Sequence, residues 1–280
     1  MSFPVTLDTE AVDRFREQGF VVTPGLLTSD EIVRFGAAVD AEVAQRTAGD
    51  ARQVSEKSRY EQSFIQCMRL WETSSVVREL SCDARLAGVA AQLLAEPEIL
   101  LWQDQALYKE AGGEATTPHQ DQCFWPIGEA PLVSAWIPFV EVNADNGAMS
   151  YVPGSHRCGG LQVVDITHSS EPYDILADPA LAGVEPELVF AQPGDVIWHH
   201  GFCVHQATAN HSSETRRVFT TVYMARGYSR AKPWPVFPLD RAGVAVGELM
   251  EGEGMPQVWP PPGDLPAVPE SRGQATGPQH

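Results

Sequence analysis

Residues 99–121 read ILLWQDQALYKEAGGEATTPHQD and set the first expectation for the fold. The run 99–109 is expected to be extended, and the Gly-Gly pair at 112–113 predicts a turn after it. The extended segment that follows ends on His119 and Asp121, which are two residues apart. Residues i and i+2 of an extended chain point to the same face. One imidazole and one carboxylate can therefore converge on a metal ion at this point.

Further runs rich in β-forming residues follow along the chain, and turn signals such as Asn146-Gly147 and Pro193-Gly194 separate them. Several short strands with regular turn signals are typical of an antiparallel sandwich or barrel. We therefore expect a mainly β fold with flanking helices, in which the barrel spans about 98–226. The expected strands lie at 99–109, 132–142, 187–190, 195–199, 202–207 and 218–224.

The segment before the barrel, about 1–97, is expected to be helical. Thr28 and Glu31 have the spacing of a capping box, which marks the start of a helix. The residues that follow carry apolar side chains at helical spacing. Shorter helices are predicted over 10–18 and 84–94, so that helices pack on one sheet of the barrel.

The end of the chain differs in composition from the rest. Proline and glycine are frequent from residue 252 onward, and such a segment buries little surface. We expect a single catalytic domain over 1–255, with an extension at 227–255, followed by a tail over 256–280. Trp259 is the residue that can anchor the first part of this tail.

The overall charge and the cysteine content exclude several classes of protein. The 280-residue chain has a formal net charge of −18, and a surface this acidic repels nucleic-acid backbones and anionic membranes. No apolar run approaches the ~20 residues of a membrane helix, and no signal peptide is visible. The cysteines are odd in number and form no C-x-x-C pair, which favours a reduced, cytoplasmic protein: Cys67, Cys82, Cys123, Cys158 and Cys203.

His119 and Asp121 alone are weak evidence for a metal site, because His-x-Asp also arises by chance. A second histidine from another strand would complete a 2-His-1-carboxylate site, which leaves coordination positions open and suits non-haem Fe(II) and O₂ chemistry. Structural zinc sites instead fill four positions, often with cysteine. The segments 198–205 (WHHGFCVH) and 215–218 (TRRV) supply further candidates. Strand alternation sends only one of the two adjacent arginines inward, and the spacing favours Arg216.

Taken together, the motifs resemble the phytanoyl-CoA dioxygenase family over roughly 20–260. The segments that carry the resemblance are His119-Gln120-Asp121, Trp136-Ile137, Asn146-Gly147-Ala148-Met149, Val152-Pro153-Gly154-Ser155-His156, Gly194-Asp195-Val196, His205 and Arg216. The ordered set is more specific than any one motif, and the 11-residue spacing from His205 to Arg216 matches the family's pattern. The resemblance implies an Fe(II)- and 2-oxoglutarate-dependent oxygenase on a double-stranded β-helix (jelly-roll, cupin-like) core.

The resemblance also implies a role for each matching residue, and the iron ligands would be His119, Asp121 and His205. Arg216 matches the arginine that pairs with the distal carboxylate of 2-oxoglutarate, and a guanidinium fork suits a carboxylate. Trp136 and Gln105 match residues of the cosubstrate pocket, and Gln120 is expected to contribute. The chain departs from the family at Ala207, where many members have a serine or threonine that contacts the same carboxylate. Arg216 then needs another residue, or a water molecule, to contact the carboxylate with it.

The implied reaction is hydroxylation of an unactivated C–H bond of a small organic substrate, with consumption of O₂ and release of succinate and CO₂. Asp121 favours this outcome because related halogenases have a small residue in its place; desaturation and ring formation stay open. The acidic chain lacks a basic cluster for a CoA ester, which favours a natural-product or amino-acid-like substrate.

Two other interpretations stay open: a jelly-roll metalloprotein that does not use 2-oxoglutarate, and a binding module that has kept the residues by descent. The sequence does not indicate the oligomeric state. His199 and His200 are interpreted as satisfied structural or surface histidines. An unbroken strand would nevertheless place His199 on the same face as His205, six residues further on.

Overall fold

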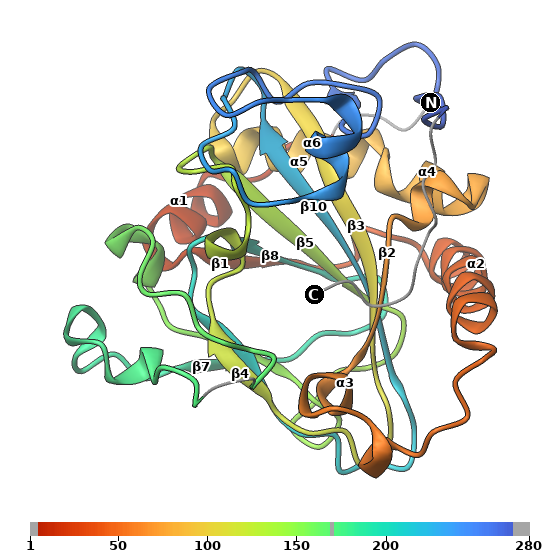
Figure 1. Ribbon diagram of the computed structural model, residues 1–280, viewed down its shortest axis with the longest axis vertical. Helices are drawn as coiled ribbons and strands as arrows, with labels where there is room; N and C mark the ends of the chain where they lie inside the picture. The colour runs from red at the N-terminus through yellow and green to blue at the C-terminus, as the bar shows by residue number, and fades with distance from the viewer. Residues whose placement is uncertain (1–4, 169–170, 271–280) are drawn as a thin grey trace.

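Two antiparallel sheets form the centre of the fold (Figure 1). The computed structural model describes residues 5–168 and 171–270. Within these residues the larger, seven-stranded sheet has the order β1-β8-β5-β10-β3-β11, with β2 also paired to β3, and the smaller sheet has the order β4-β9-β6-β7. This arrangement confirms the predicted jelly-roll core. The strands are β1 Phe20–Thr23, β2 Ile65–Met68, β3 Ile99–Lys109, β4 Thr116–His119, β5 Leu132–Pro138, β6 Met149–Tyr151, β7 Glu187–Val189, β8 Val196–His200, β9 His205–Ala207, β10 Arg216–Ala225 and β11 Gln257–Trp259.

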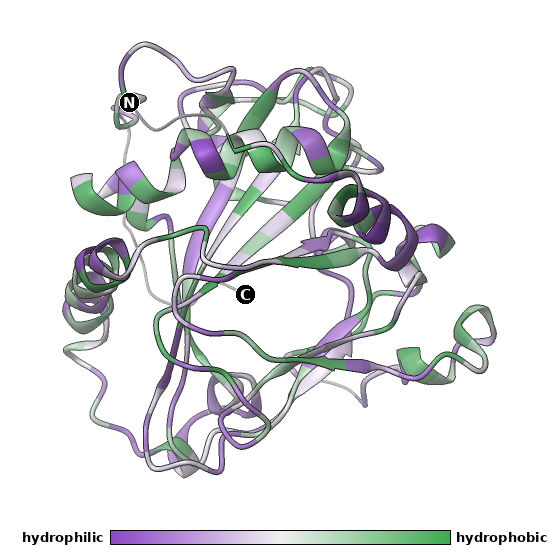
Figure 2. Cartoon of the chain, turned by 180° about the vertical axis from the view of Figure 1, so that it is seen from behind, coloured by the Kyte–Doolittle hydropathy of each residue, from purple (hydrophilic) through white to green (hydrophobic). Residues whose placement is uncertain are grey.

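Helices of the N-terminal segment pack on the outer face of the larger sheet, and Figure 2 shows them striped in hydrophilic and hydrophobic colours. Their apolar sides share one buried cluster with outward-facing residues of the sheet such as Val133, Ala135 and Ile137 of β5. In the described part of the chain, no helix combines the length and the apolar composition needed to cross a membrane. The helices are α1 Thr9–Gln18, α2 Ser29–Thr47, α3 Arg59–Ser63, α4 Ser75–Ser81, α5 Ala84–Leu94 and α6 Phe237–Ala242, with short 3-10 helices η1 Val54–Glu56, η2 Leu70–Glu72, η3 Asp121–Phe124, η4 Ser155–Cys158, η5 Ile175–Ala177 and η6 Pro179–Leu181.

The N-terminal segment is helical as predicted, but it also contributes strands. The capping box is present: the Glu31 backbone N–H donates to the Thr28 hydroxyl at 3.3 Å, and the Thr28 N–H donates to the Glu31 carboxylate at 2.8 Å. Helix α5 has the predicted bounds and α1 begins one residue early. The expectation of helices alone over 1–97 was wrong, because β1 and β2 pair with β8 and β3 of the larger sheet.

A β-bulge in β3 decides which of its side chains face the interior. Consecutive residues of β10 pair with Leu101 and Gln103, which leaves Trp102 as an extra residue. An extra residue reverses the alternation of side chains along a strand. Leu101 therefore faces the helices before the bulge and Tyr108 faces them after it, while Gln103 and Gln105 line the interior.

Several predicted segments differ from the structure in their extent, and the strand expected over 132–142 ends at Pro138. The strand expected over 202–207 begins only at His205, because the chain turns after His200, where the Cys203 N–H donates to the His200 carbonyl at 2.8 Å. The tail expected over 256–280 was wrong for its first residues, since β11 pairs with β3 and Val258 is fully buried. The expected anchor Trp259 packs against the helix-side cluster. Residues 271–280 lie outside the described part.

The turn before β8 predicts a large stability effect at Gly194. Its φ is +105°, and a Cβ atom there would lie 2.7 Å from the Leu27 carbonyl oxygen. The Leu27 N–H also donates to the Gly194 carbonyl at 3.0 Å. We expect Gly194→Ala to lower the free energy of unfolding by about 1–3 kcal/mol, measured by urea denaturation. Gly25→Ala is the control: its φ is also positive, but no atom lies within 4 Å of the added Cβ. Equal losses for the two variants would contradict the steric argument.

Candidate metal centre

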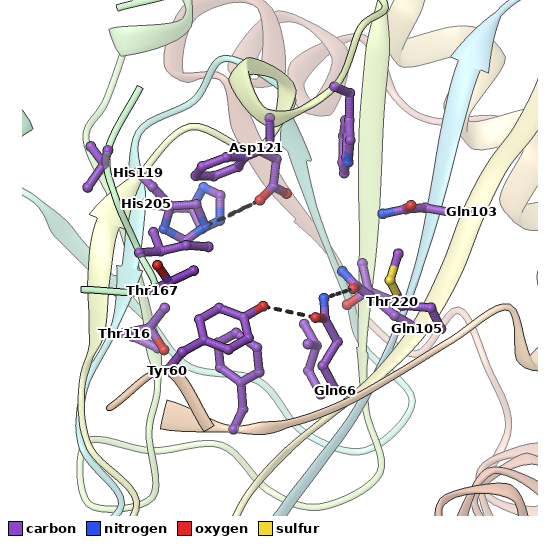
Figure 3. Close-up of a pocket in the computed structure, with 18 of the residues that line it drawn as sticks. Tyr60, Gln66, Gln103, Gln105, Thr116, His119, Asp121, Thr167, His205 and Thr220 are labelled. Atoms are coloured by element: carbon purple, nitrogen blue, oxygen red, sulfur yellow. Dashed lines mark hydrogen bonds and ion pairs between the residues drawn. The ribbon is translucent and has the colours of Figure 1, made fainter. Parts of the chain in front are cut away.

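Two histidines and an aspartate converge between the sheets (Figure 3). His119 ends β4 and His205 begins β9, and the pairing of these strands places the two residues opposite each other. Asp121 opens η3. The Nε2 atoms of His119 and His205 lie 3.3 and 3.5 Å from Asp121 Oδ1. One ligand atom from each residue lies within 4.8 Å of the others, so the structure brings the three predicted ligands together.

Hydrogen bonds fix which ring nitrogen of each histidine is free. His119 Nδ1 lies 2.7 Å from the Thr117 carbonyl oxygen, and His205 Nδ1 lies 2.9 Å from the Cys203 carbonyl oxygen. A carbonyl only accepts, so Nδ1 carries the proton and Nε2 presents a lone pair. Burial lowers the pKa of His205 to about 3, which keeps this ring neutral. Two histidine Nε2 atoms and a carboxylate oxygen thus face one another, which is a donor set that a divalent cation accepts.

A third buried histidine holds the other carboxylate oxygen of the aspartate. His199 Nε2 lies 3.3 Å from Asp121 Oδ2, its Nδ1 lies 3.3 Å from the Tyr151 hydroxyl, and Ser134 Oγ lies 3.5 Å from the same Oδ2. The side chain is 2% exposed. Sequence reasoning interpreted His199 as structural or at the surface and missed this contact. The six-residue spacing between His199 and His205 could have indicated that both side chains face the same site, although the chain turns between the two.

These contacts predict a positioning role for His199. We expect His199→Ala to weaken Fe(II) binding by about 10–100-fold, since loss of an outer-shell partner of a metal ligand has effects of this size. Equilibrium dialysis of the purified protein measures the affinity. His200→Ala is the matched control, because the neighbouring ring accepts from the Phe202 N–H and packs near Phe15. Unchanged Fe(II) affinity in His199→Ala would show that the Asp121 contact does not position the ligand.

At the other end of the interior, Arg216 presents a buried positive charge. The residue is 3% exposed, and its guanidinium donates to the carbonyl oxygens of Gly147 at 2.5 Å and Leu107 at 3.5 Å. Burial lowers its pKa to about 10, so it is still a cation at neutral pH. The Arg216 Nε has no hydrogen-bond partner among the described residues. Arg217, by contrast, points outward and pairs with Asp40, which confirms the predicted alternation.

The remaining predicted residues separate into two groups. Trp136 lines the cavity, with its ring 5.2 Å from the Arg216 guanidinium carbon. Gln105 also lines the cavity, and its Oε1 accepts from Gln66 at 2.6 Å. Gln120 does not face this space. Its amide donates to the carbonyls of residues 159 and 202 and accepts from the backbone N–H of residue 161. The expected contribution of Gln120 to cosubstrate binding was wrong, because its polar atoms already have these partners.

A cavity of about 500 Å³ joins the metal centre to the space beyond it. This volume lies in the range of small-molecule sites, roughly 300–1,000 Å³. Gln103 directs its amide into the cavity (Figure 3) and is 4% exposed, with no side-chain hydrogen bond to the described residues. Sequence reasoning missed Gln103, whose orientation depends on the bulge. The wall is mainly apolar and includes Phe64, Phe124, Trp125, Ile166, Val236 and Phe237.

A jelly roll that directs two histidine nitrogens and one carboxylate to a single point defines the class of 2-His-1-carboxylate metal proteins. A sequence model of the phytanoyl-CoA dioxygenase family matches residues 15–218. The chain belongs to this family.

Individual proteins resemble the chain at lower similarity. A probable alpha-ketoglutarate-dependent hypophosphite dioxygenase of Stutzerimonas stutzeri is 27% identical over 60% of the chain, and the match spans 57% of that relative's length. The 1-deoxypentalenic acid 11-beta-hydroxylase of Streptomyces arenae is 24% identical and is covered more fully, with 83% of this chain and 88% of the relative aligned. The crystal structure of the non-haem alpha-ketoglutarate-dependent carbocyclase SnoK from nogalamycin biosynthesis is 27% identical. The match covers 91% of this chain and 99% of the SnoK chain, with a TM-score of 0.73.

Proposed function

We propose that this chain is an Fe(II)- and 2-oxoglutarate-dependent dioxygenase that hydroxylates an unactivated C–H bond of a small organic molecule. One observation carries the proposal: three candidate ligand atoms share one cavity with a buried guanidinium that has no carboxylate partner among the described residues. The family match and the alpha-ketoglutarate-dependent relatives support it. In the balanced reaction, substrate C–H, 2-oxoglutarate and O₂ give the alcohol, succinate and CO₂.

The predicted site residues that line the cavity each have a role in this proposal. The ligands to Fe(II) are His119, Asp121 and His205. Arg216 holds the distal carboxylate of 2-oxoglutarate beside Trp136, because a guanidinium suits a carboxylate. Gln105 has its Oε1 engaged by Gln66, which leaves its Nε2 free to donate to the cosubstrate. When bound, iron and 2-oxoglutarate would supply the activation of O₂, while the apolar wall keeps water from the reacting centre.

The cavity wall favours an uncharged, largely apolar substrate that carries a hydroxyl or keto group. Aromatic and aliphatic side chains provide most of the contact surface, and the buried Gln103 amide requires a polar partner. The chain's acidic net charge opposes the binding of the phosphates of a CoA ester. Succinate release should therefore be driven by free molecules of this kind. Turnover of acyl-CoA esters alone would contradict this substrate class.

A cytoplasmic location belongs to the same proposal. All five cysteines are free thiols, and four of them are buried. Free thiols are typical of proteins in reducing compartments.

An anaerobic titration tests the proposed function. The purified apo-protein is titrated with Fe(II) and then with 2-oxoglutarate, and the visible metal-to-ligand charge-transfer band is followed. We expect the band to appear on addition of 2-oxoglutarate and succinate to form after O₂ and substrate are admitted. Binding of Fe(II) without the band would contradict the use of 2-oxoglutarate.

A further inference from the structure

The buried amide of Gln103 has no partner among the residues that the structure describes. Gln103 of β3 lines the cavity, is 4% exposed and forms no side-chain hydrogen bond within the described ranges. Buried side-chain amides are almost always hydrogen-bonded, so this one requires a partner from the molecule that fills the cavity. The bulge at Trp102 turns the Gln103 side chain inward, and bulges beside active sites re-aim side chains in this way.

The pairing of the strands places Gln103 at the level of the candidate metal centre. Val222 of β10 lies opposite Gln103 of β3 on one side and opposite Ser134 of β5 on the other. Ser134 in turn lies opposite His199 of β8, and both of these side chains approach the same oxygen of Asp121. The four strand residues form one row across the sheet. Gln103 and Ser134 are separated in this row by β10, so their backbones lie roughly 10 Å apart.

The next row of the sheet belongs to the proposed cosubstrate pocket. Thr220 of β10 lies opposite Gln105 and Trp136 in this row. Its hydroxyl is also buried without a hydrogen-bond partner among the described residues, so it is the alternative partner for a polar group of the substrate. Gln103 instead lies level with the metal centre, and Figure 3 shows it on the opposite side of the cavity from the candidate ligands.

The chemistry of the amide indicates which group it binds. An amide is uncharged and offers both a donor and an acceptor, so a keto oxygen can accept from its Nε2, and a hydroxyl can bond to either end. The apolar side chains of Trp125, Val236 and Phe237 line the same cavity and suit a hydrocarbon frame. An apolar molecule with one such oxygen therefore satisfies both the amide and the wall.

We propose that Gln103 binds the keto or hydroxyl oxygen of the substrate and thereby selects the C–H bond that faces the metal centre. Because the amide and the ligands lie on opposite sides of the cavity, the selected C–H bond is remote from the carbon that carries the oxygen. Gln103 is therefore a specificity-determining residue. This inference rests on the proposed function, since it requires that the metal and 2-oxoglutarate occupy the same cavity.

The test compares small ketones with their parent hydrocarbons, camphor with bornane and 2-decalone with decalin. Each probe is titrated into protein loaded with 2-oxoglutarate and with Mn(II), which broadens the proton NMR lines of nearby groups. We expect the wild type to bind each ketone about 10-fold more tightly than its hydrocarbon, and Gln103→Leu to bind the two equally. In the wild type, the protons farthest from the carbonyl group should broaden most.

Two controls separate this contact from other effects. Thr220→Val keeps the shape and removes the alternative hydroxyl, so the preference for ketones should remain. Gln103→Leu should still form the charge-transfer band with Fe(II) and 2-oxoglutarate, which shows that its cosubstrate pocket is intact. The assignment would be overturned by a wild type without the preference, by a preference that survives in Gln103→Leu, or by strongest broadening next to the carbonyl group. Failure of the wild type to form the band would instead reject the proposed function.

Discussion

Asp121→Ala is expected to abolish the charge-transfer band and to weaken Fe(II) binding beyond the ~10–100-fold that loss of an outer-shell partner causes. The carboxylate is the one anionic donor of the proposed triad, and its Oδ1 lies 3.3 and 3.5 Å from the two imidazole nitrogens. Without it, two neutral nitrogens would have to hold a dication alone. Asp121→Asn keeps the shape and removes the charge, and it should behave in the same way. Dialysis against Fe(II), followed by 2-oxoglutarate titration, measures both effects.

The apo-protein provides the control for folding in this experiment. Circular dichroism and a thermal melt of the Asp121→Ala and wild-type apo-proteins should show that the variant is folded before its Fe(II) binding is compared. Asp145→Ala, at an exposed position, should leave Fe(II) binding unchanged. A folded Asp121→Ala protein that binds Fe(II) with wild-type affinity and forms the band would exclude this residue as a ligand.

Arg216→Met is expected to raise the Kd for 2-oxoglutarate by about 10²–10³-fold while Fe(II) affinity stays the same. The substitution keeps an apolar stem and removes a charge that lies fully buried beside the Trp136 ring. Truncating one partner of a buried, hydrogen-bonded charge pair costs about 2–5 kcal/mol, and each 1.4 kcal/mol is a factor of ten. The charge-transfer titration at increasing 2-oxoglutarate measures the change.

Arg217→Met is the matched control for this prediction, because Arg217 adjoins Arg216 in β10 but pairs with Asp40 outside the cavity. It should leave the Kd for 2-oxoglutarate unchanged. 2-Oxopentanoate should bind the wild type and Arg216→Met equally, since it has no distal carboxylate for the guanidinium to hold. A normal Kd for 2-oxoglutarate in Arg216→Met would place the carboxylate elsewhere in the cavity.

Local signals predicted much of the fold and the centre of the site. The bounds of α5 and β3 matched expectation because a capped apolar helix and a β-rich run before a Gly-Gly turn are encoded in adjacent residues. His119, Asp121 and His205 were predicted from a two-residue spacing and an ordered set of motifs. Strand alternation predicted that one of the two adjacent arginines points inward, the spacing favoured Arg216, and the buried and exposed sides of β10 confirm this choice.

The missed features depend on contacts between distant parts of the chain. Gln103 enters the cavity only because Trp102 is a bulge, and a bulge appears when β3 is paired with β10. His199 reaches Asp121 although the chain turns before β9. Gln120 lies between two proposed ligands in sequence, yet η3 begins at the next residue and the Gln120 amide bonds to the backbone. Sequence spacing alone does not contain these orientations.

The division of the cavity between strands and segments outside the two sheets has an evolutionary consequence. The proposed ligands and the arginine come from β4, β9, β10 and the start of η3, whereas much of the apolar wall comes from the segments 163–167 and 235–238. The register of the sheets fixes the relative positions of the proposed ligands and the arginine. The segments 163–167 and 235–238 can instead accept insertions and substitutions without shifting any strand. Gene duplication followed by drift in those two segments would therefore yield descendants with new substrates and an inherited reaction.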